Sequence, residues 1–368
     1  MIKKMTKIIE IGVISIISVV IIFGLIKIAV APLQEFFQAW QIGNKIEGVR
    51  PEGSLAVSDK RPVEFIFGGD VMLSRQVNSR MAKYNDYTWP FVKIADFLRS
   101  ADLTMINLES PFIFANDYNV PTGSFMFKAD PRALAGVLLA GIDLVSLANN
   151  HTLNQGQIGL KENFEILTGS DIKYIGAGNN EEEARRAEIV EIYGNKFAFL
   201  AYAYPDDSSV ASETRAGIAN MDIAKMQADV KKLKEAGNIV IVNMHAGTEY
   251  VTEPNWQQED FARAAIDAGA EAVIGHHPHW PQVYEFYQDK PIIYSLGNLV
   301  FDQMWSLETR QGLLAKFIWR DGWEKMELVP VKSYDYGQTE IISDEIERLS
   351  IFKKIGAPEN GVIWEKGN

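Results

Sequence analysis

Short apolar runs that each end in a cluster of polar residues recur along this chain, and this pattern constrains the fold more than any other feature. The runs have the length of β-strands and alternate with helix-like segments from about residue 63 onward. Such alternation predicts an α/β fold with much parallel sheet. The polar clusters that follow the runs are Gly69-Asp70 and residues 107–109, 149–151, 245–249, 275–279 and 297–298.

All histidines of the chain lie within three of these clusters. Strands of an open α/β sheet converge with their carboxyl ends on one crevice, so clusters distant in sequence should meet there. Imidazole rings with carboxylate and amide oxygens suit a divalent transition metal such as Mn, Zn or Fe. The residue types therefore predict a metal site, with a buried hydrogen-bonded histidine network as the alternative. The five histidines are His151, His245, His276, His277 and His279.

Individual members of the clusters also have structural interpretations. Asp70 after a strand is by itself more typical of a turn or cap, and Glu109 is equally typical of a solvated loop. His245 can be a hydrogen-bonded core histidine. The pair His277 and His279 differs, because the proline between them restricts the loop and lets both rings point at one centre.

Three further polar residues lie in or beside these clusters, and two interpretations of them stay open. Glu249, Asn298 and Asp302 can fix the orientation of the imidazole rings by hydrogen bonds. They can equally serve as caps of helices or turns.

Composition and motifs exclude several classes of protein. The absence of cysteine excludes disulfides, thiolate zinc sites and iron–sulfur clusters. The net charge of -12 argues against the basic face that nucleic-acid binding requires. The sequence contains no P-loop, no dinucleotide-binding glycine motif, no helical H-E-x-x-H and no G-x-S-x-G elbow. Nucleic-acid binding, nucleotide cofactors and a serine nucleophile therefore have no support.

The N-terminal segment predicts a membrane anchor. Residues 11–31 form a largely apolar run whose only charged residue is Lys27, and about 20 residues suffice to span a bilayer. Three lysines, at positions 3, 4 and 7, precede the run, which predicts a single-pass protein with a cytoplasmic N-terminus and an extracellular remainder. The alternative is a signal peptide cleaved after Ala29-Val30-Ala31, although Pro32 fits that cleavage poorly.

The rest of the chain divides into three expected parts after residues 1–31, the cytoplasmic tip and anchor. They are a juxtamembrane segment and linker at residues 32–61, one large domain at residues 62–332, and a tail at residues 333–368 that either packs on the domain or forms a small helix. Asp130-Pro131 predicts a helix start and Gly141 its end. The other expected helices cover residues 91–98, 223–233 and 256–268, and the expected strands cover residues 63–67, 102–107, 142–147, 239–242, 272–274 and 291–294.

Six ordered motifs between about residues 62 and 330 resemble those of the bacterial capsule-synthesis CapA family, also called the poly-γ-glutamate synthesis protein family. That family is related to calcineurin-like metallophosphoesterases. The resemblance implies a four-layer α-β-β-α sandwich with metals at the strand ends and a domain anchored on the outer face of the membrane. The motifs are Gly69-Asp70-Val71-Met72, Asn107-Leu108-Glu109, Asn149-Asn150-His151, His245 with Glu249, Gly275 to His279, and Ser295 to Gln303.

The resemblance also implies roles for the residues. His151 would be the acid near the leaving group. Met72 stands where metallophosphoesterases have a histidine, and a thioether cannot replace imidazole for a hard ion, so one of two metal positions loses a ligand. The implied ligands of one or two ions are Asp70, Glu109, Asn150, His245, His277 and His279, and the implied surrounding or substrate-binding residues are Asn107, Asn149, Glu249, His276, Asn298 and Asp302.

Two functions of different class follow. The first is a metal-dependent hydrolase or transferase that uses a metal-activated water on a phosphoester or an anionic polymer such as poly-γ-glutamate. The second is a non-catalytic membrane subunit that binds metal or polymer and assists capsule assembly or export with other capsule-synthesis membrane proteins. Met72 favours the second function, and His151 favours the first.

Overall fold

The structure is a computed structural model that describes residues 61–114, 125–204 and 209–367. These residues belong to one compact unit, Ser58–Asn368. The predicted anchor at residues 1–31 and nearly all of the predicted juxtamembrane segment lie outside the described residues. Within the described ranges, no helix combines the length and the apolar character needed to cross a membrane.

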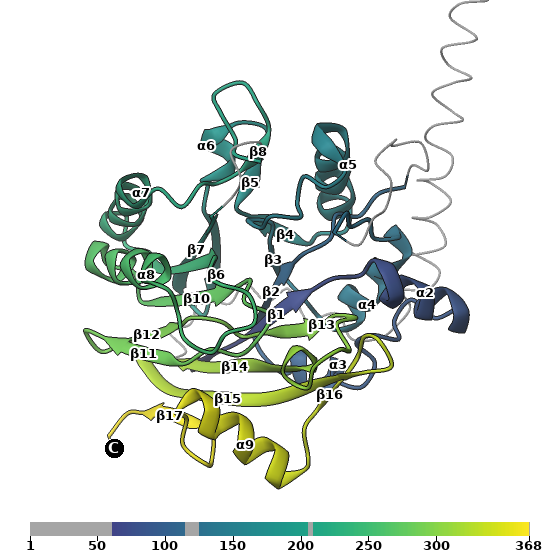
Figure 1. Ribbon diagram of the computed structural model, residues 1–368. Coiled ribbons are helices and arrows are strands. Elements are labelled where there is room, and N and C mark those ends of the chain that lie inside the picture. The colour runs from purple at the N-terminus through teal and green to yellow at the C-terminus, as the bar shows by residue number, and fades with distance from the viewer. Residues whose placement is uncertain (1–60, 115–124, 205–208, 368) are drawn as a thin grey trace, which may run out of the picture. The chain divides into compact units, whose positions relative to one another are not determined.

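A nine-stranded mixed sheet forms one half of the unit (Figure 1). Strands β1 to β4 run parallel to one another, whereas β14 to β17 are antiparallel to their neighbours. The path across the sheet is β16 (Gln338–Ile341), β15 (Trp323–Tyr334), β14 (Gln311–Trp319), β1 (Val63–Val71), β2 (Leu103–Leu108), β3 (Leu144–Ser146) and β4 (Lys173–Ile175), with β13 (Asn298–Val300) beside β1 and β17 (Val362–Glu365) beside β15.

A six-stranded mixed sheet forms the other half. Its central strands β7, β9, β10 and β12 are parallel, and antiparallel strands close both edges. The path is β11 (Tyr284–Tyr287), β12 (Lys290–Ile293), β10 (Ala272–His276), β9 (Ile239–His245), β7 (Asn195–Ala203) and β6 (Glu188–Ile192), and the short strands β5 (Ala177–Gly178) and β8 (Gly217–Ile218) pair separately.

Aromatic side chains pack the two sheets against each other. Phe65 of β1 meets Phe197 of β7 edge to face, with ring centroids 4.8 Å apart. Trp323 of β15 lies 6.2 Å from Phe65 and donates from Nε1 to the carbonyl of Glu271, which directly precedes β10. These buried aromatic rings form an apolar core between the two sheets.

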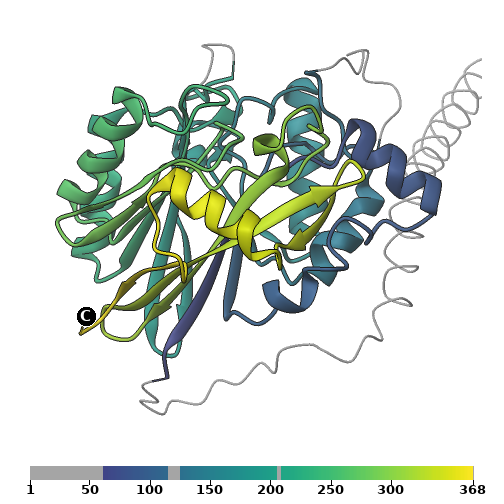
Figure 2. The same cartoon turned by 60° about the horizontal axis from the view of Figure 1, so that its bottom comes forward.

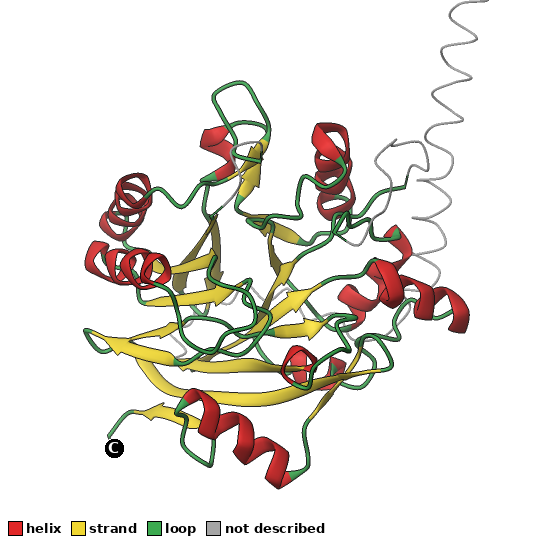
Figure 3. Cartoon of the chain, viewed as in Figure 1, coloured by secondary structure: helices red, strands yellow, loops and turns green. Residues whose placement is uncertain are grey.

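Helices cover the outer sides of both sheets (Figure 3). Met226 and Val230 of α7 and Phe261 of α8 are buried in one apolar cluster with strands β7, β9 and β10. The α/β class predicted from the sequence is confirmed. The helices are α2 (Arg75–Tyr84), α3 (Ala95–Leu98), α4 (Leu134–Leu139), α5 (Gly156–Thr168), α6 (Glu181–Ala184), α7 (Ile223–Glu235), α8 (Trp256–Ala268) and α9 (Glu345–Ile355), with short 3₁₀ turns η1 (Pro131–Ala133) and η2 (Glu308–Arg310).

The C-terminal residues are part of the nine-stranded sheet. Strand β15 runs through the expected boundary at residue 332, and β16 and β17 both pair with it. Helix α9 lies across this sheet in Figure 2 and buries Ile351, Phe352 and Ile355. Both expected alternatives for the tail therefore occur together, because its helix packs on the domain.

The first strand extends further than the sequence indicated. We expected Asp70 to follow a strand ending at residue 67, but β1 continues to Val71 and includes Asp70. Gly69 explains the difference, since a Cβ there would lie 1.9 Å from the carbonyl oxygen of Gly297. Without that side chain, the two backbones approach closely enough for Asp70 to donate from its amide to Gly297 at 2.9 Å.

Candidate metal centre

The carboxyl ends of strands from both sheets meet at one place. Asp70 is in register with Asn107 of β2 and Asn298 of β13. In the other sheet, His245 at the end of β9 is in register with His276 at the end of β10. The parallel topology thus brings together polar clusters that are far apart in sequence, as the strand-end argument predicted.

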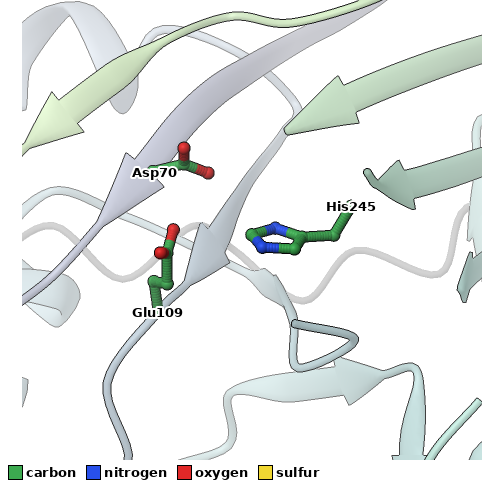
Figure 4. Close-up of side chains that lie close together, drawn as sticks. All are labelled: Asp70, Glu109 and His245. Atoms are coloured by element: carbon green, nitrogen blue, oxygen red, sulfur yellow. The ribbon is translucent and has the colours of Figure 1, made fainter. Parts of the chain in front are cut away.

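Three buried side chains form the centre of the cluster (Figure 4). Asp70, Glu109 and His245 point toward one another, and one potential ligand atom of each lies within 4.8 Å of the other two. Asp70 and Glu109 are fully buried, so their charges are shielded from water. Two carboxylates and an imidazole in this arrangement can hold a divalent cation.

Two further donors converge on the ring of His245. Its Nε2 lies 2.9 Å from Oδ1 of Asn150 and 3.1 Å from Nδ1 of His277. Donor atoms of three side chains within about 3 Å are typical of ligands that share one metal ion, whose bonds to nitrogen and oxygen are about 2.0–2.2 Å long. His277 adopts a φ of 100°, a left-handed backbone conformation that turns its ring into the cluster.

Asn298 determines how His279 presents its ring. Nδ1 of His279 lies 2.9 Å from Oδ1 of Asn298 and 3.2 Å from Oδ2 of Asp70. Both partners are acceptors, so Nδ1 carries a proton and Nε2 is the ring nitrogen left to face the cluster. Nε2 faces Oε1 of Glu109 at 3.8 Å. A hydrogen-bonded Nδ1 with Nε2 directed at the site is the arrangement expected of a metal-binding histidine.

Asn107 and Asn149 form a buried amide framework under the cluster. Nδ2 of Asn107 donates to Asp70 at 2.8 Å and to Glu109 at 3.2 Å. Asn149 donates to Oδ1 of Asn107 and to the carbonyl of Leu108. These bonds fix the two carboxylates relative to each other.

His151 lies at the border of the cluster. Its Nδ1 contacts Oδ1 of Asn154 at 2.9 Å, and its Nε2 lies 3.7 Å from Oε1 of Glu109. The ring of Phe127 stacks on it with centroids 4.0 Å apart. Because Asn154 accepts the Nδ1 proton, Nε2 is the atom that can exchange a proton with a bound molecule.

The remaining expected residues have different surroundings. His276 is buried with its Nδ1 3.7 Å from Asp70. Glu249 is exposed beside the cluster, where its charge acts on Glu109 and His277. Asp302 accepts from the amide of Gln76 at 3.0 Å and from Arg75, so it fits the cap interpretation.

Burial disfavours the charged form of four of the imidazole rings. It lowers the pKa of His276, His277 and His151 to about 4, and it lowers the pKa of His245 well below its ordinary value. The nearby His279 adds to the effect on His277, His151 and His245. Neutral imidazole is the form that binds metal ions, so the rings are ready to coordinate near pH 7.

The two carboxylates differ in charge. Burial, followed by the charge of Asp70, raises the pKa of Glu109 well above its ordinary value. Burial acts in the same direction on Asp70, but the hydrogen bond from His279 and the neighbouring histidines hold its pKa below its usual range. A cation between them would stabilise both as anions.

Unpaired atoms test whether a metal fits this cluster. Among the described residues, Oε1 of Glu109 accepts no hydrogen bond although it is fully buried. A buried carboxylate oxygen without a donor is costly unless a cation or another group satisfies it. It faces Nε2 of both His151 and His279. The donor set and the unpaired oxygen therefore fit a divalent ion.

Met72 takes no part in this donor set. Its sulfur accepts from the amide of Ser74 at 3.1 Å, and the side chain is fully buried. This bond stabilises the turn between β1 and α2. Met72 therefore has a structural role in this turn.

Arg75 and Phe127 also lie at the site, and the sequence analysis missed both. Arg75 follows the first motif by three residues, and Phe127 lies in a segment without periodicity. A basic residue shortly after a predicted ligand was the available signal for Arg75. The stacking partner of His151 could not be identified before the fold was known.

A mixed α/β domain with a buried carboxylate–histidine cluster at its strand ends is a candidate metal-binding protein. The family model described as "Bacterial capsule synthesis protein PGA_cap" matches residues 64–303, which is more than half of the chain. The chain therefore belongs to this family, as the motifs predicted.

Three relatives illustrate the similarity. "Capsule biosynthesis protein CapA" of Bacillus anthracis is 29% identical over 308 residues, covering 81% of this chain and 74% of the relative. "PGA biosynthesis protein CapA" of Bacillus subtilis is 25% identical over 296 residues, covering 80% and 78%. A "probable polyglutamine synthesis accessory protein" of Mycobacterium tuberculosis is 31% identical over 250 residues, covering 64% and 65%.

Proposed function

We propose that this chain is a membrane-anchored, outward-facing protein of capsule or poly-γ-glutamate synthesis whose domain is a metal-dependent hydrolase or transferase. Family membership and the names of the two Bacillus relatives support the capsule context. The apolar run at residues 11–31 supports a single-pass anchor with the domain outside the cell. Two packed sheets with helices on their outer sides support a metallophosphoesterase-type four-layer sandwich.

The observation that carries the proposal is the convergence of donors around Nε2 of His245, beside the buried and unpaired Oε1 of Glu109. Glu109, Asn150, His245 and His277 would hold one ion, and Asp70 and His279 offer donors on the other side of Glu109. A divalent cation held there would supply Lewis-acid activation of a water molecule and of a phosphoryl or acyl oxygen.

The protein's own contribution is to position groups and to move a proton. Asn107 holds Asp70 and Glu109 at a fixed separation, so the cluster does not need to reorganise when it binds a ligand. His151 would exchange a proton at Nε2, since Asn154 engages Nδ1. Because burial lowers the pKa of this ring to about 4, Nε2 would take up the proton before passing it to a leaving group. Stacking on Phe127 keeps this imidazole at the edge of the cluster, where a leaving group would depart.

Replacement of His151 tests the catalytic role. His151→Ala should retain metal and fold but lose roughly 10²–10⁴ in rate on alkyl phosphodiesters, whose leaving group must be protonated. Nitrophenyl esters should lose much less, because their leaving group is already a stable anion. Equal losses on both substrates together with loss of metal would make His151 a ligand.

A non-catalytic subunit that binds metal or polymer during capsule assembly is the second candidate. Met72 favours it, because its sulfur is committed to the amide of Ser74 and leaves one metal position with fewer ligands. The printed name of the mycobacterial relative, an accessory protein, agrees with such a role. A metal-loaded wild-type protein that turns over neither substrate type would favour this candidate.

A further inference from the structure

Arg75 occupies an unusual position at the start of α2. Its backbone φ is 46°, a left-handed conformation that is rare for a residue with a Cβ. The preceding Ser74 makes no side-chain cap bond to the helix. Asp302 caps it instead, by accepting from the amide of Gln76 at 3.0 Å. Strain of this kind is typical of functional sites, where the surrounding structure maintains it.

Asp302 also holds the guanidinium group of Arg75. Its carboxylate accepts from Nε at 3.2 Å and from Nη2. The side chain of Asp302 is 7% exposed, whereas 23% of the Arg75 side chain remains accessible. A buried acid that fixes a more exposed arginine orients a planar, permanently charged group.

Two aromatic rings connect this guanidinium to the candidate metal centre. Its Cζ lies 4.8 Å from the ring centre of Phe127 and 5.5 Å from that of Phe301. Phe127 stacks on His151, and Phe301 meets the ring of His279 edge to face at 4.9 Å. One aromatic ring, Phe127, therefore contacts both the guanidinium group and His151, the proposed proton carrier. A second ring, Phe301, contacts both the guanidinium group and His279, a proposed metal ligand.

The charge of Arg75 acts within the centre. Burial dominates the pKa shifts of Glu109 and His151, but the Arg75 charge opposes the rise in the pKa of Glu109 and adds to the fall in the pKa of His151. An anion placed near His151 would interact with the same positive charge.

We propose that Arg75 binds an oxyanion group of the substrate, phosphoryl or carboxylate, on the side of the reacting bond that faces His151. Asp302 is the positioning residue that aims it. This inference rests on the proposed function and specifies its substrate class, which is a molecule with an anionic oxygen group next to the bond that reacts. Planar arginine suits both oxyanions because it can donate two parallel hydrogen bonds.

Calorimetric titration of the full-length chain tests this assignment, with inorganic phosphate and glutarate as separate probes. Arg75→Gln should weaken binding of the cognate probe by about 10- to 100-fold, the loss typical of a hydrogen bond to a charged group. Arg75→Lys keeps the charge but loses the planar fork, so its loss should be smaller. Arg132→Gln removes a similar arginine–aspartate pair at the surface and should bind both probes like the wild type.

The role of Asp302 has its own readout. Asp302→Asn should weaken the same probe while the metal content stays unchanged, and Asp302→Glu should restore part of the affinity. If Arg75→Gln does not fold, the comparison of Arg75→Lys with the wild type decides. Equal affinity of wild type, Arg75→Lys and Arg75→Gln for both probes would overturn the inference.

Titrations of metal-loaded and chelator-treated protein separate the two proposals. Arg75-dependent binding in a protein that never takes up metal would overturn the proposed function and leave the inference standing. Metal uptake with binding that does not depend on Arg75 would overturn the inference alone.

Discussion

Replacement of Glu109 by glutamine should have opposite effects on stability and on metal binding. Glu109 is fully buried beside Asp70, and its Oε1 accepts no hydrogen bond among the described residues. Glutamine has the same shape and no charge, and its amide group can still pair with Asn107. Burial disfavours the charged form of Glu109, and an unsatisfied buried polar group costs about 1–3 kcal/mol. Metal-free Glu109→Gln should therefore be more stable than the wild type by up to about that amount.

Metal should reverse this order. A ligand at a hundred times its dissociation constant stabilises the folded state by about 2.7 kcal/mol. At the roughly 2–4 °C per kcal/mol found for domains of 150–250 residues, the wild type should gain roughly 5–10 °C in melting temperature. Glu109→Gln should gain much less, because it lacks the central carboxylate ligand.

Thermal melts with chelator and with added Mn²⁺ or Zn²⁺ measure both effects. Glu253→Gln changes an exposed glutamate in the loop after β9 and should match the wild type under both conditions. The reasoning is refuted if Glu109→Gln is less stable than the wild type in chelator and if metal shifts neither protein. That result would favour the buried histidine network.

Three further predictions concern the core, the support of the site and one ion-pair cluster. Phe65→Ala should cost about 3–5 kcal/mol in denaturant unfolding, because the ring is fully buried against Phe197 between the sheets; a cost below about 1 kcal/mol would contradict that packing. Asn298→Ala should lower metal affinity about 10- to 100-fold in competition titrations, because His279 loses the acceptor that fixes its Nδ1 proton. Burial would raise the pKa of Glu271, but hydrogen bonds from two lysines hold it below the ordinary glutamate value. The ionised Glu271 therefore stabilises the fold above the ordinary glutamate pKa, and this stabilisation is lost as pH falls through the lowered pKa. Glu271→Gln should therefore reduce stability by about 1–2 kcal/mol near pH 7, with the difference from wild type shrinking in acid.

The sequence identified the parallel strands and their polar ends better than the antiparallel half of the fold. Strands β2, β9 and β10 were predicted within a few residues, because each is a short apolar run with a clear polar end. Strands β14 and β15 were not predicted, since their apolar and polar residues follow no simple alternation.

Helices were likewise predicted well only where the local sequence marks their ends. Helix α8 begins and ends where its sequence signals indicated, with a capping box at Asn255 and a left-handed Gly269. The expected helix at residues 91–98 is limited to α3, Ala95–Leu98, and α5 was missed. Both cases depend on tertiary packing, which local propensity does not include.

The composition of the site was also easier to predict than its details. Strand order and residue type together placed Asp70, Glu109 and His245 in one cluster. The interpretation of Asp302 needed the structure, because only the fold brings α2 next to residue 302. A side chain's partner across two elements depends on register, which the sequence does not state.

Metal content of the purified full-length protein tests the central claim most directly. Elemental analysis, paired with titration of the chelated protein, should find a divalent transition metal bound to the wild type. His245→Ala should lose most of it while keeping its fold, because the ring contacts Asn150 and His277 and offers a ligand atom within 4.8 Å of one from each carboxylate of the cluster. A wild-type protein that binds no divalent metal, or a His245→Ala variant that binds it equally well, would contradict the account.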